Sequence, residues 1–162
     1  MGSSATNKIA LLAGNGVLPA TLAESAAARG YEVHAYGFKG MIAPEVRRTA
    51  ASVFEVPFCK LGAVVEKMQA DGMTQAVTIG SVAQMSVIGG TPQFDSLALE
   101  LWKKLPDRRV DSIMRALLDE LKTRGIETLE LPPFLSSMLA PAGAVASRPP
   151  TVEEWEDIRF GF

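Results

Sequence analysis

Cysteine and histidine are nearly missing from this chain, which has one of each in 162 residues. A single cysteine cannot form a disulfide within the chain, so a reducing compartment, the cytoplasm, is expected. Cys59 follows Phe58 at the end of an apolar run, and we interpret it as a small buried residue. His34 lies inside a predicted strand, and the sequence pairs it with no serine or cysteine. This favours a structural histidine over a catalytic one.

Long apolar runs and an excess of charge of one sign are also missing. No run reaches the roughly 18 residues that cross a bilayer, and residues 1–7 lack the apolar centre of a signal peptide. The chain has 16 Lys and Arg against 18 Asp and Glu, a net charge of −2. A general nucleic-acid-binding surface needs a cationic face, so we expect no nucleic-acid partner.

Short apolar runs alternate with helical patterns along the chain. Five runs have the length of buried strands, at residues 8–13, 31–36, 52–58, 76–79 and 126–131. Such alternation is typical of a parallel sheet with right-handed crossovers. We therefore predict an α/β fold, a Rossmann-like open parallel sheet of about five strands in the order 3-2-1-4-5, with helices on both faces.

The second half of the chain is more helical. Asp95 or Ser96 could cap a helix that runs to Leu105, and Asp107 could cap the next one. The apolar residues of that second helix predict a stripe on one face, formed by Val110, Ile113, Met114, Leu117, Leu118 and Leu121.

The chain changes character after Leu139. Residues 140–150 are rich in Ala, Gly and Pro, as extended connectors are, and the Thr151 and Glu154 pattern predicts a capped helix over 152–158. We therefore expect a flexible terminus at 1–7, a ligand-binding domain at 8–139, and a connector with a short helix at 140–162 that leads to a second domain outside this chain. Two terminal aromatic residues suggest a docking partner, a continuation or self-association.

The sharpest local feature follows the first predicted strand. Gly14, Asn15, Gly16, Leu18 and Pro19 belong to the run Gly-Asn-Gly-Val-Leu-Pro. Glycines permit a tight turn and a close ligand, and the next helix offers free N–H groups to an anion. The glycines could instead only build the turn. The third glycine of a dinucleotide fingerprint is replaced by Pro19, and no acidic residue ends the second strand, so we do not expect NAD.

A second glycine turn, Gly80-Ser81-Val82, follows the fourth predicted strand. In the predicted strand order, the first and fourth strands are neighbours, so both turns should flank the topological switch point where ligands bind. Ser81 could bond a phosphate or a sugar hydroxyl, or serve only as a loop hydroxyl.

The remaining polar residues indicate no catalytic set. Lys103, Lys104, Arg108 and Arg109 could contact a phosphate or lipid headgroups, although we favour a solvated surface. The carboxylates are scattered along predicted helices, with no pair that suggests an acid–base site or a metal site.

The run Ile9–Pro19 resembles the opening of the LpxI-type UDP-2,3-diacylglucosamine pyrophosphatases of lipid A biosynthesis. Further segments are similar to that family in the same order, namely Lys60-Leu61-Gly62, Gly80-Ser81-Val82, Leu139-Ala140-Pro141-Ala142-Gly143, Pro149 and Asp157-Ile158. The resemblance begins at about Lys8 and extends to the end of this chain.

The resemblance implies a metal-dependent hydrolase that cleaves a nucleotide-linked glycolipid at its α-phosphate, giving UMP and 2,3-diacylglucosamine 1-phosphate. It implies two domains, with the substrate between them and with the catalytic acids and Mg²⁺ in the second. This chain is similar to the first, so its expected role is to bind substrate through the two glycine turns. A cytoplasmic protein at the inner membrane surface would fit that substrate.

Two segments depart from the family pattern. The turn after Gly80 lacks the usual Arg-Pro pair, and residues 105–109 replace the usual Gly-Asp-Asp. The alternative is therefore a stand-alone homologue without catalysis, which binds a sugar phosphate or nucleotide or docks a partner.

Overall fold

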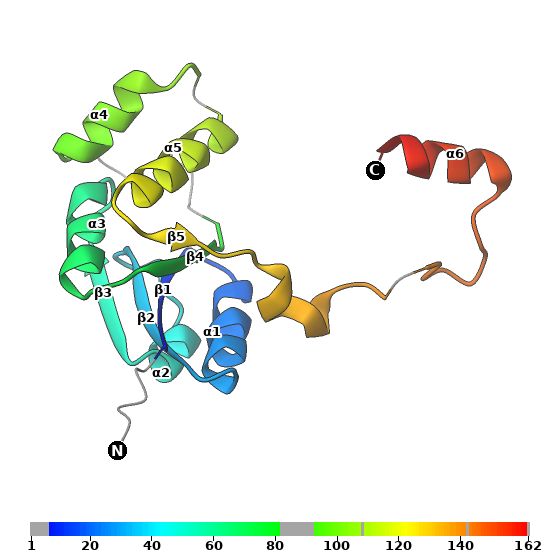
Figure 1. Ribbon diagram of the computed structural model, residues 1–162, viewed down its shortest axis with the longest axis horizontal. Coiled ribbons are helices and arrows are strands. Elements are labelled where there is room, and N and C mark those ends of the chain that lie inside the picture. Colours follow the sequence, from blue (N-terminus) through cyan, green and yellow to red (C-terminus); the bar gives the residue numbers. More distant parts are fainter. Residues whose placement is uncertain (1–6, 82–92, 108, 142, 162) are drawn as a thin grey trace.

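A five-stranded parallel sheet forms the centre of the structure, a computed structural model (Figure 1). The structure describes residues 7–81, 93–107, 109–141 and 143–161. Its strands are β1 (Asn7–Ala13), β2 (Tyr31–Phe38), β3 (Ser52–Val56), β4 (Gln75–Ile79) and β5 (Glu127–Thr128). Their order is β3-β2-β1-β4-β5, which confirms the predicted order.

Helices cover both faces of this sheet, as predicted (Figure 1). One face carries α1 (Leu18–Ala28), α2 (Pro44–Thr49) and the 3₁₀ segment η2 (Pro132–Met138). The other carries α3 (Leu61–Ala70) and α5 (Val110–Thr123), with α4 (Ser96–Lys104) packed against both. The architecture is therefore the predicted Rossmann-like α/β fold.

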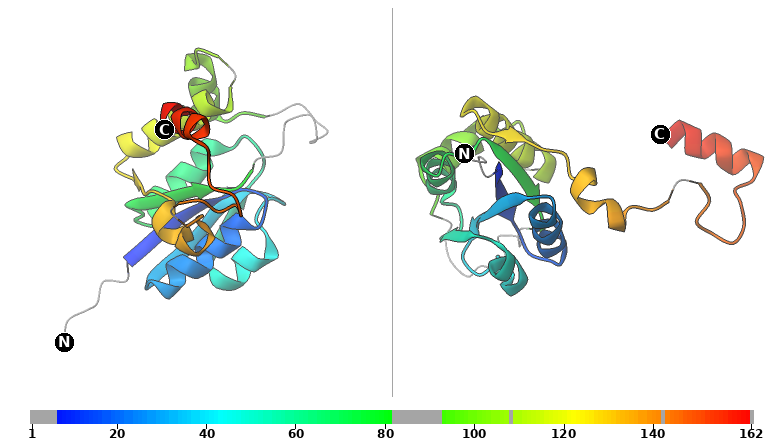
Figure 2. Two further views of the ribbon diagram at one scale, coloured as in Figure 1. Left: turned by 90° about the vertical axis from the view of Figure 1, so that its right-hand side faces the viewer. Right: turned by 60° about the horizontal axis from the view of Figure 1, so that its bottom comes forward.

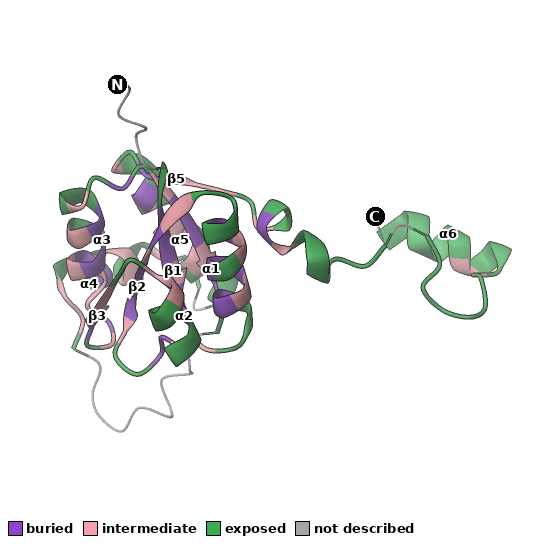
Figure 3. Ribbon diagram, turned by 90° about the horizontal axis from the view of Figure 1, so that it is seen from below, coloured by how far each residue is buried: buried purple, intermediate pink, exposed green. Residues whose placement is uncertain are grey.

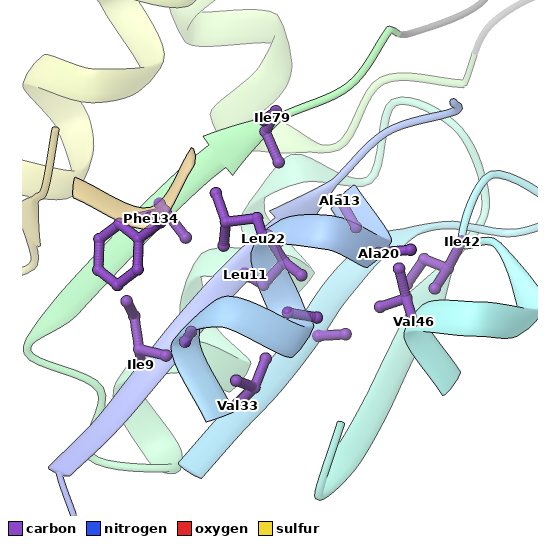
Figure 4. Close-up of a cluster of buried hydrophobic side chains, with 14 residues drawn as sticks. Ile9, Leu11, Ala13, Ala20, Leu22, Val33, Ile42, Val46, Ile79 and Phe134 are labelled. Carbon is purple, nitrogen blue, oxygen red and sulfur yellow. The ribbon is translucent and has the colours of Figure 1, made fainter. Parts of the chain in front are cut away.

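The side chains of β1 contribute to the core on both faces of the sheet, because successive side chains of a strand point to opposite faces. Ile9 and Leu11 are fully buried on the α1 face, where Phe134 of η2 joins them (Figure 4). Ala10, between them, is buried on the α3 face. Figure 3 shows this burial concentrated on the strands and on the inner sides of the helices. The two clusters hold the carboxyl ends of β1 and β4 in place.

Several predicted boundaries and caps were wrong. β3 ends at Val56, because Pro57 has no N–H to continue a ladder, and β5 has only two residues. Asp107 does not cap α5: Arg109 is the N-cap residue, and its N–H donates to the Asp107 carboxylate at 3.0 Å. Of the two residues predicted to cap α4, Asp95 or Ser96, the structure has Asp95 as the cap.

The predicted apolar stripe of α5 is covered only in part. Leu121 is fully buried, whereas Val110 is 73% exposed and Ile113 38% exposed. The buried end of the helix lies over β5, and a strand of two residues is too short to cover the rest. The apolar face of α5 is therefore buried near the C-terminal end of the helix and exposed near its N-terminal end.

The C-terminal helix α6 (Val152–Gly161) lies away from the sheet (Figure 2). The predicted capping box is present, since the Thr151 N–H donates to Glu154 Oε2 at 2.7 Å and the Glu154 N–H donates to Thr151 Oγ1 at 3.3 Å. No described residue of α6 is buried, and Phe160 is 95% exposed. Phe162, the other terminal aromatic residue, lies outside the described residues.

Candidate functional site at the carboxyl ends of β1 and β4

The two glycine turns are joined to each other by backbone hydrogen bonds. The Asn15 N–H donates to the Ser81 carbonyl at 2.7 Å, and the Ser81 N–H donates to the Asn15 carbonyl at 3.0 Å. Just below them, the Gly14 N–H donates to the Ile79 carbonyl at 2.9 Å. The predicted convergence of the two turns is therefore present, and it takes the form of a short antiparallel bridge between them.

Gly14 and Gly80 are glycines because the backbones of the two turns touch. A Cβ on Gly14 would lie 2.6 Å from the Ser81 carbonyl oxygen. A Cβ on Gly80 would lie 2.8 Å from the carbonyl carbon of Gly14, and the Gly80 φ is +101°. Real Cβ atoms do not approach backbone atoms this closely, and a φ in that range strongly favours glycine. These two glycines therefore hold the turns together.

Gly16 has a different role, because it faces open space. Its φ is +111°, and a Cβ there would meet no heavy atom within 4 Å. Gly16, Val17 and Leu18 are all exposed at the start of α1. Across the described parts of the chain, their three backbone N–H groups donate no hydrogen bond. Unpaired N–H groups at a helix N-terminus favour an approaching anion.

The other predicted contact residues divide between the core and the surface. Pro19 is buried in the first turn of α1, where its missing N–H costs nothing. Ser81 is exposed, and its hydroxyl has no hydrogen-bond partner within the described residues. Val82 lies outside the described residues. The exposed part of the candidate site thus consists of Gly16, Leu18 and Ser81, with Val17 beside them.

The N-terminus of α3 follows the end of β3, and a carboxylate of the same chain accepts hydrogen bonds from its free N–H groups. Asp95 Oδ2 accepts hydrogen bonds from the N–H groups of Gly62 at 2.7 Å and Ala63 at 3.3 Å, while its Oδ1 accepts from Ala98 at 2.9 Å. One carboxylate therefore caps both α3 and α4. A Cβ on Gly62 would lie only 3.1 Å from Asp95 Oδ2, which explains the glycine of the Lys60-Leu61-Gly62 segment.

Cys59 lies next to this cap and is buried, as predicted. Burial raises the pKa of its thiol, and the Asp95 carboxylate raises it further. A raised pKa keeps the thiol protonated at neutral pH, which makes it a poor nucleophile. Cys59 is thus a packing residue of the α3–α4 corner.

A polar cluster that the sequence did not predict lies at the amino-terminal ends of β2 and β3. His34 Nδ1 lies 2.7 Å from Ser52 Oγ, and His34 Nε2 lies 2.7 Å from Glu32 Oε1. Next to them, the Tyr36 hydroxyl donates to Asp71 Oδ2 at 2.6 Å. The spacing of Glu32 and His34 signals a shared face, but only the β2–β3 register could have identified Ser52 as the partner.

Two titrating groups of this cluster are shifted in opposite directions. Lys67 donates a hydrogen bond to Asp71, and together with the Tyr36 hydroxyl it lowers the pKa of that carboxyl. Burial raises the pKa of the Tyr36 phenol, and the bond to Asp71 raises it further. Both shifts favour a neutral phenol donating to an ionised carboxylate.

The basic residues near the α4–α5 junction are partly paired. Lys104 bonds Glu100 at 2.6 Å, and Arg109 Nε lies 3.8 Å from Asp107. All four side chains are exposed, as in a solvated surface. Arg108 lies outside the described residues.

Neither a metal centre nor a membrane span is found in the part of the chain that the structure describes. Its His, Cys, Asp and Glu side chains form no group of three or more that could hold a metal ion. No described helix is long and apolar enough to cross a bilayer. A groove lined by Leu118, Lys122 and Thr128 runs between α5 and β5, away from the glycine turns.

The sheet order, the two joined turns and the open N-terminus of α1 define a Rossmann-like α/β domain. Two solved structures are similar to part of this chain. Glycinamide-RNase-transformylase T from Mycobacterium tuberculosis has a TM-score of 0.44 and 16% identity, over 75% of this chain and 26% of its own. UDP-glucose 4-epimerase from Brucella ovis in complex with NAD has a TM-score of 0.49 and 18% identity, over 75% of this chain and 34% of its own.

The family model of the LpxI N-terminal domain matches residues 8–138. The chain belongs to this family, as its motifs indicated. No curated protein matches the chain.

Proposed function

We propose that this chain is the substrate-binding half of a UDP-2,3-diacylglucosamine pyrophosphatase. The whole enzyme would hydrolyse the nucleotide-linked glycolipid at its α-phosphate, giving UMP and 2,3-diacylglucosamine 1-phosphate. The observation that carries the proposal is the match of residues 8–138 to the LpxI N-terminal domain. The joined turns after β1 and β4 support it, because they place unpaired backbone donors at the ligand edge of the fold.

In this proposal the start of α1 receives a phosphate of the substrate. The N–H groups of Gly16, Val17 and Leu18 offer hydrogen bonds, and the helix dipole favours negative charge there. The exposed hydroxyl of Ser81 lies across the Asn15–Ser81 bridge, on the β4 side of the same edge. These donors are held by the backbone contacts of Gly14 and Gly80, so they need little reorganisation when a charged ligand arrives.

The remaining parts of the reaction are assigned to protein outside this chain. The family resemblance implies Mg²⁺, but the described residues include no cluster that fits a metal ion. We therefore assign the metal and the catalytic acids to a second domain. The hydrolysis is tested by measuring UMP release from the UDP-lipid by a protein that continues beyond Phe162. Absence of UMP release by the longer protein would leave a non-catalytic binding domain as the function.

Binding by this chain can be tested directly by thermal unfolding. We expect UDP or a short-chain 2,3-diacylglucosamine 1-phosphate to raise Tm, and NADH to leave it unchanged. A ligand at 100 times its Kd stabilises a folded protein by about 2.7 kcal/mol, which corresponds to roughly 5–10 °C for a chain of this size. If neither phosphate compound shifts Tm, the turns do not bind these ligands on their own.

The variant Leu18→Asp locates the bound phosphate. Leu18 is the first residue of α1 and is 38% exposed, so a carboxylate fits there and suits the helix dipole. It should repel a phosphate and remove the ligand-induced Tm shift while the fold is retained. Val110→Asp is the matched control, because Val110 is the exposed first residue of α5. Loss of the shift in both variants would mean that the start of α1 is not the binding position.

A further inference from the structure

In the polar cluster on β2 and β3, a histidine is hydrogen-bonded to a serine through one ring nitrogen and to a carboxylate through the other. Ser52 Oγ and His34 Nδ1 are 2.7 Å apart, and His34 Nε2 and Glu32 Oε1 are 2.7 Å apart. If the carboxylate accepts the Nε2–H, the unprotonated Nδ1 faces the serine hydroxyl. This is the arrangement in which an imidazole can remove the proton of a serine and make it a nucleophile.

The fold holds these three side chains together through the strand register. Glu32 and His34 are two residues apart on β2, so they share one face of the sheet. His34 is paired with Ser52 of β3 in the parallel ladder, which brings the serine to the same face. β3 is an edge strand of the sheet, and Ser52 is exposed. A solvent molecule or small substrate can thus reach the serine, while the His34 side chain is only 12% exposed.

Acidic and polar side chains surround the His34 imidazole. Glu32 contacts the imidazole directly, and Asp71, at the end of α3, interacts electrostatically with it. Lys67 and the Tyr36 hydroxyl face the same region, and both bond Asp71. Two carboxylates therefore lie near the position where positive charge would develop on the imidazole.

We propose that Ser52 is an acyl-accepting nucleophile, with His34 as its general base and Glu32 as a positioning residue. Ser52 Oγ attacks the carbonyl carbon of an activated ester, and its proton passes to His34 Nδ1. The bond between the carbonyl carbon and the leaving oxygen breaks, and His34 returns the proton to the departing alcohol or phenol. Water then attacks the acyl-serine by the reverse sequence, releasing a carboxylic acid and the free serine.

The surroundings select the class of substrate. Ser52 is exposed on β3, an edge strand of the sheet. Such an open position fits a compact acyl group on a good leaving group, as in an activated ester. This activity is separate from the proposed binding of a sugar nucleotide, because its residues lie at the opposite ends of the strands.

The test uses p-nitrophenyl acetate and the intact chain. We expect a burst of p-nitrophenolate of at most one equivalent, a mass increase of one acetyl group, and an acetylated peptide that contains Ser52. His34→Gln should slow the burst by about tenfold or more, because it removes a general base. Glu32→Gln should slow it less and leave its amplitude unchanged, since the glutamine oxygen can still accept the Nε2–H.

Ser52→Ala should abolish the burst without loss of buried atoms, and Ser137→Ala, at another exposed serine, is the matched control. Circular dichroism and Tm establish that each variant is folded. Acetylation confined to lysines such as Lys67, or a burst of equal rate in His34→Gln, would overturn the proposal. The proposal is supported if Ser52→Ala loses the acetylated peptide and the burst, Ser137→Ala keeps both, and His34→Gln has a slower burst.

Discussion

The N-termini of α1 and α3 lie at the same edge of the sheet, and they differ in what meets their free N–H groups. At α3, the N–H groups of Gly62 and Ala63 both donate to the carboxylate of Asp95. At α1, no side chain caps the helix, and Leu18 is exposed. When a carboxylate of the same chain already accepts from the free N–H groups of a helix N-terminus, few of those groups remain to bind a ligand.

This difference separates two motifs that both resemble the family. Lys60-Leu61-Gly62 is a structural segment, whose glycine makes room for Asp95. The turn after β1 is built around Gly14 for contact with β4, and its exposed part at Gly16 is left open. Of these two helix N-termini, the first turn of α1 is therefore the one available to an external phosphate.

The largest expected effect comes from disrupting the contact between the two turns. Gly80→Ala places a Cβ 2.8 Å from the Gly14 carbonyl carbon at a φ of +101°. We expect it to lower the free energy of unfolding by about 3 kcal/mol, measured by urea denaturation. It should also separate the two turns and remove any ligand-induced Tm shift.

Gly72→Ala is the control for this prediction, because Gly72 has a φ of +71° but open space around its Cβ position. It should cost only about 1–2 kcal/mol, the price of the left-handed backbone alone. Equal losses in the two variants would show that the backbone contact between the turns contributes nothing.

A smaller effect is expected from removing the carboxylate that caps α3. Asp95→Ala removes the acceptor of three backbone N–H groups and the cap of two helices. The free energy of unfolding should fall by about 2 kcal/mol. Asp95→Asn keeps one oxygen acceptor and should recover part of that loss. Inorganic phosphate extends the comparison between α1 and α3. If phosphate raises the Tm of Asp95→Ala but not that of the unmodified chain, then the uncapped N-terminus of α3 binds an anion.

The smallest effect concerns the far end of α3, where Asp71 accepts from Lys67 and Tyr36. Its pKa is lowered from the ordinary 3.8, so its stabilisation is present above that value and is lost as the pH falls through the lower folded value. Tyr36→Phe should cost about 1.5 kcal/mol at neutral pH and weaken the pH dependence of unfolding below 3.8. An unchanged acid profile in the variant would mean that Tyr36 does not stabilise the Asp71 carboxylate.

The fold was predictable because its signals are local and repeated. Runs such as Ile9–Ala13, separated by helical patterns and glycine stops, indicated strands and helices in turn, and the handedness of crossovers left few strand orders. The convergence of the Gly14 and Gly80 turns followed from that order. The extent of β5 and the exposure of Val110 did not, because they depend on how far a neighbouring strand extends.

Contacts between distant side chains were beyond sequence reasoning. Asp95 is one of two residues predicted to cap α4, but its bond to Gly62, 33 positions away, has no local signal. His34 was expected to have no catalytic partner, and Ser52 became visible only through the parallel register of β2 and β3.

The amino-acid sequence by itself determined the fold class, the family and the position of the two glycine turns, since these rest on periodicity and on residues whose backbone preferences are intrinsic. Only the tertiary structure decided which glycines pack against backbone, which helix start stays open, and which side chains bond His34. Those outcomes depend on contacts between segments far apart in the chain, where a shift of a few tenths of an ångström matters, and no local pattern encodes them.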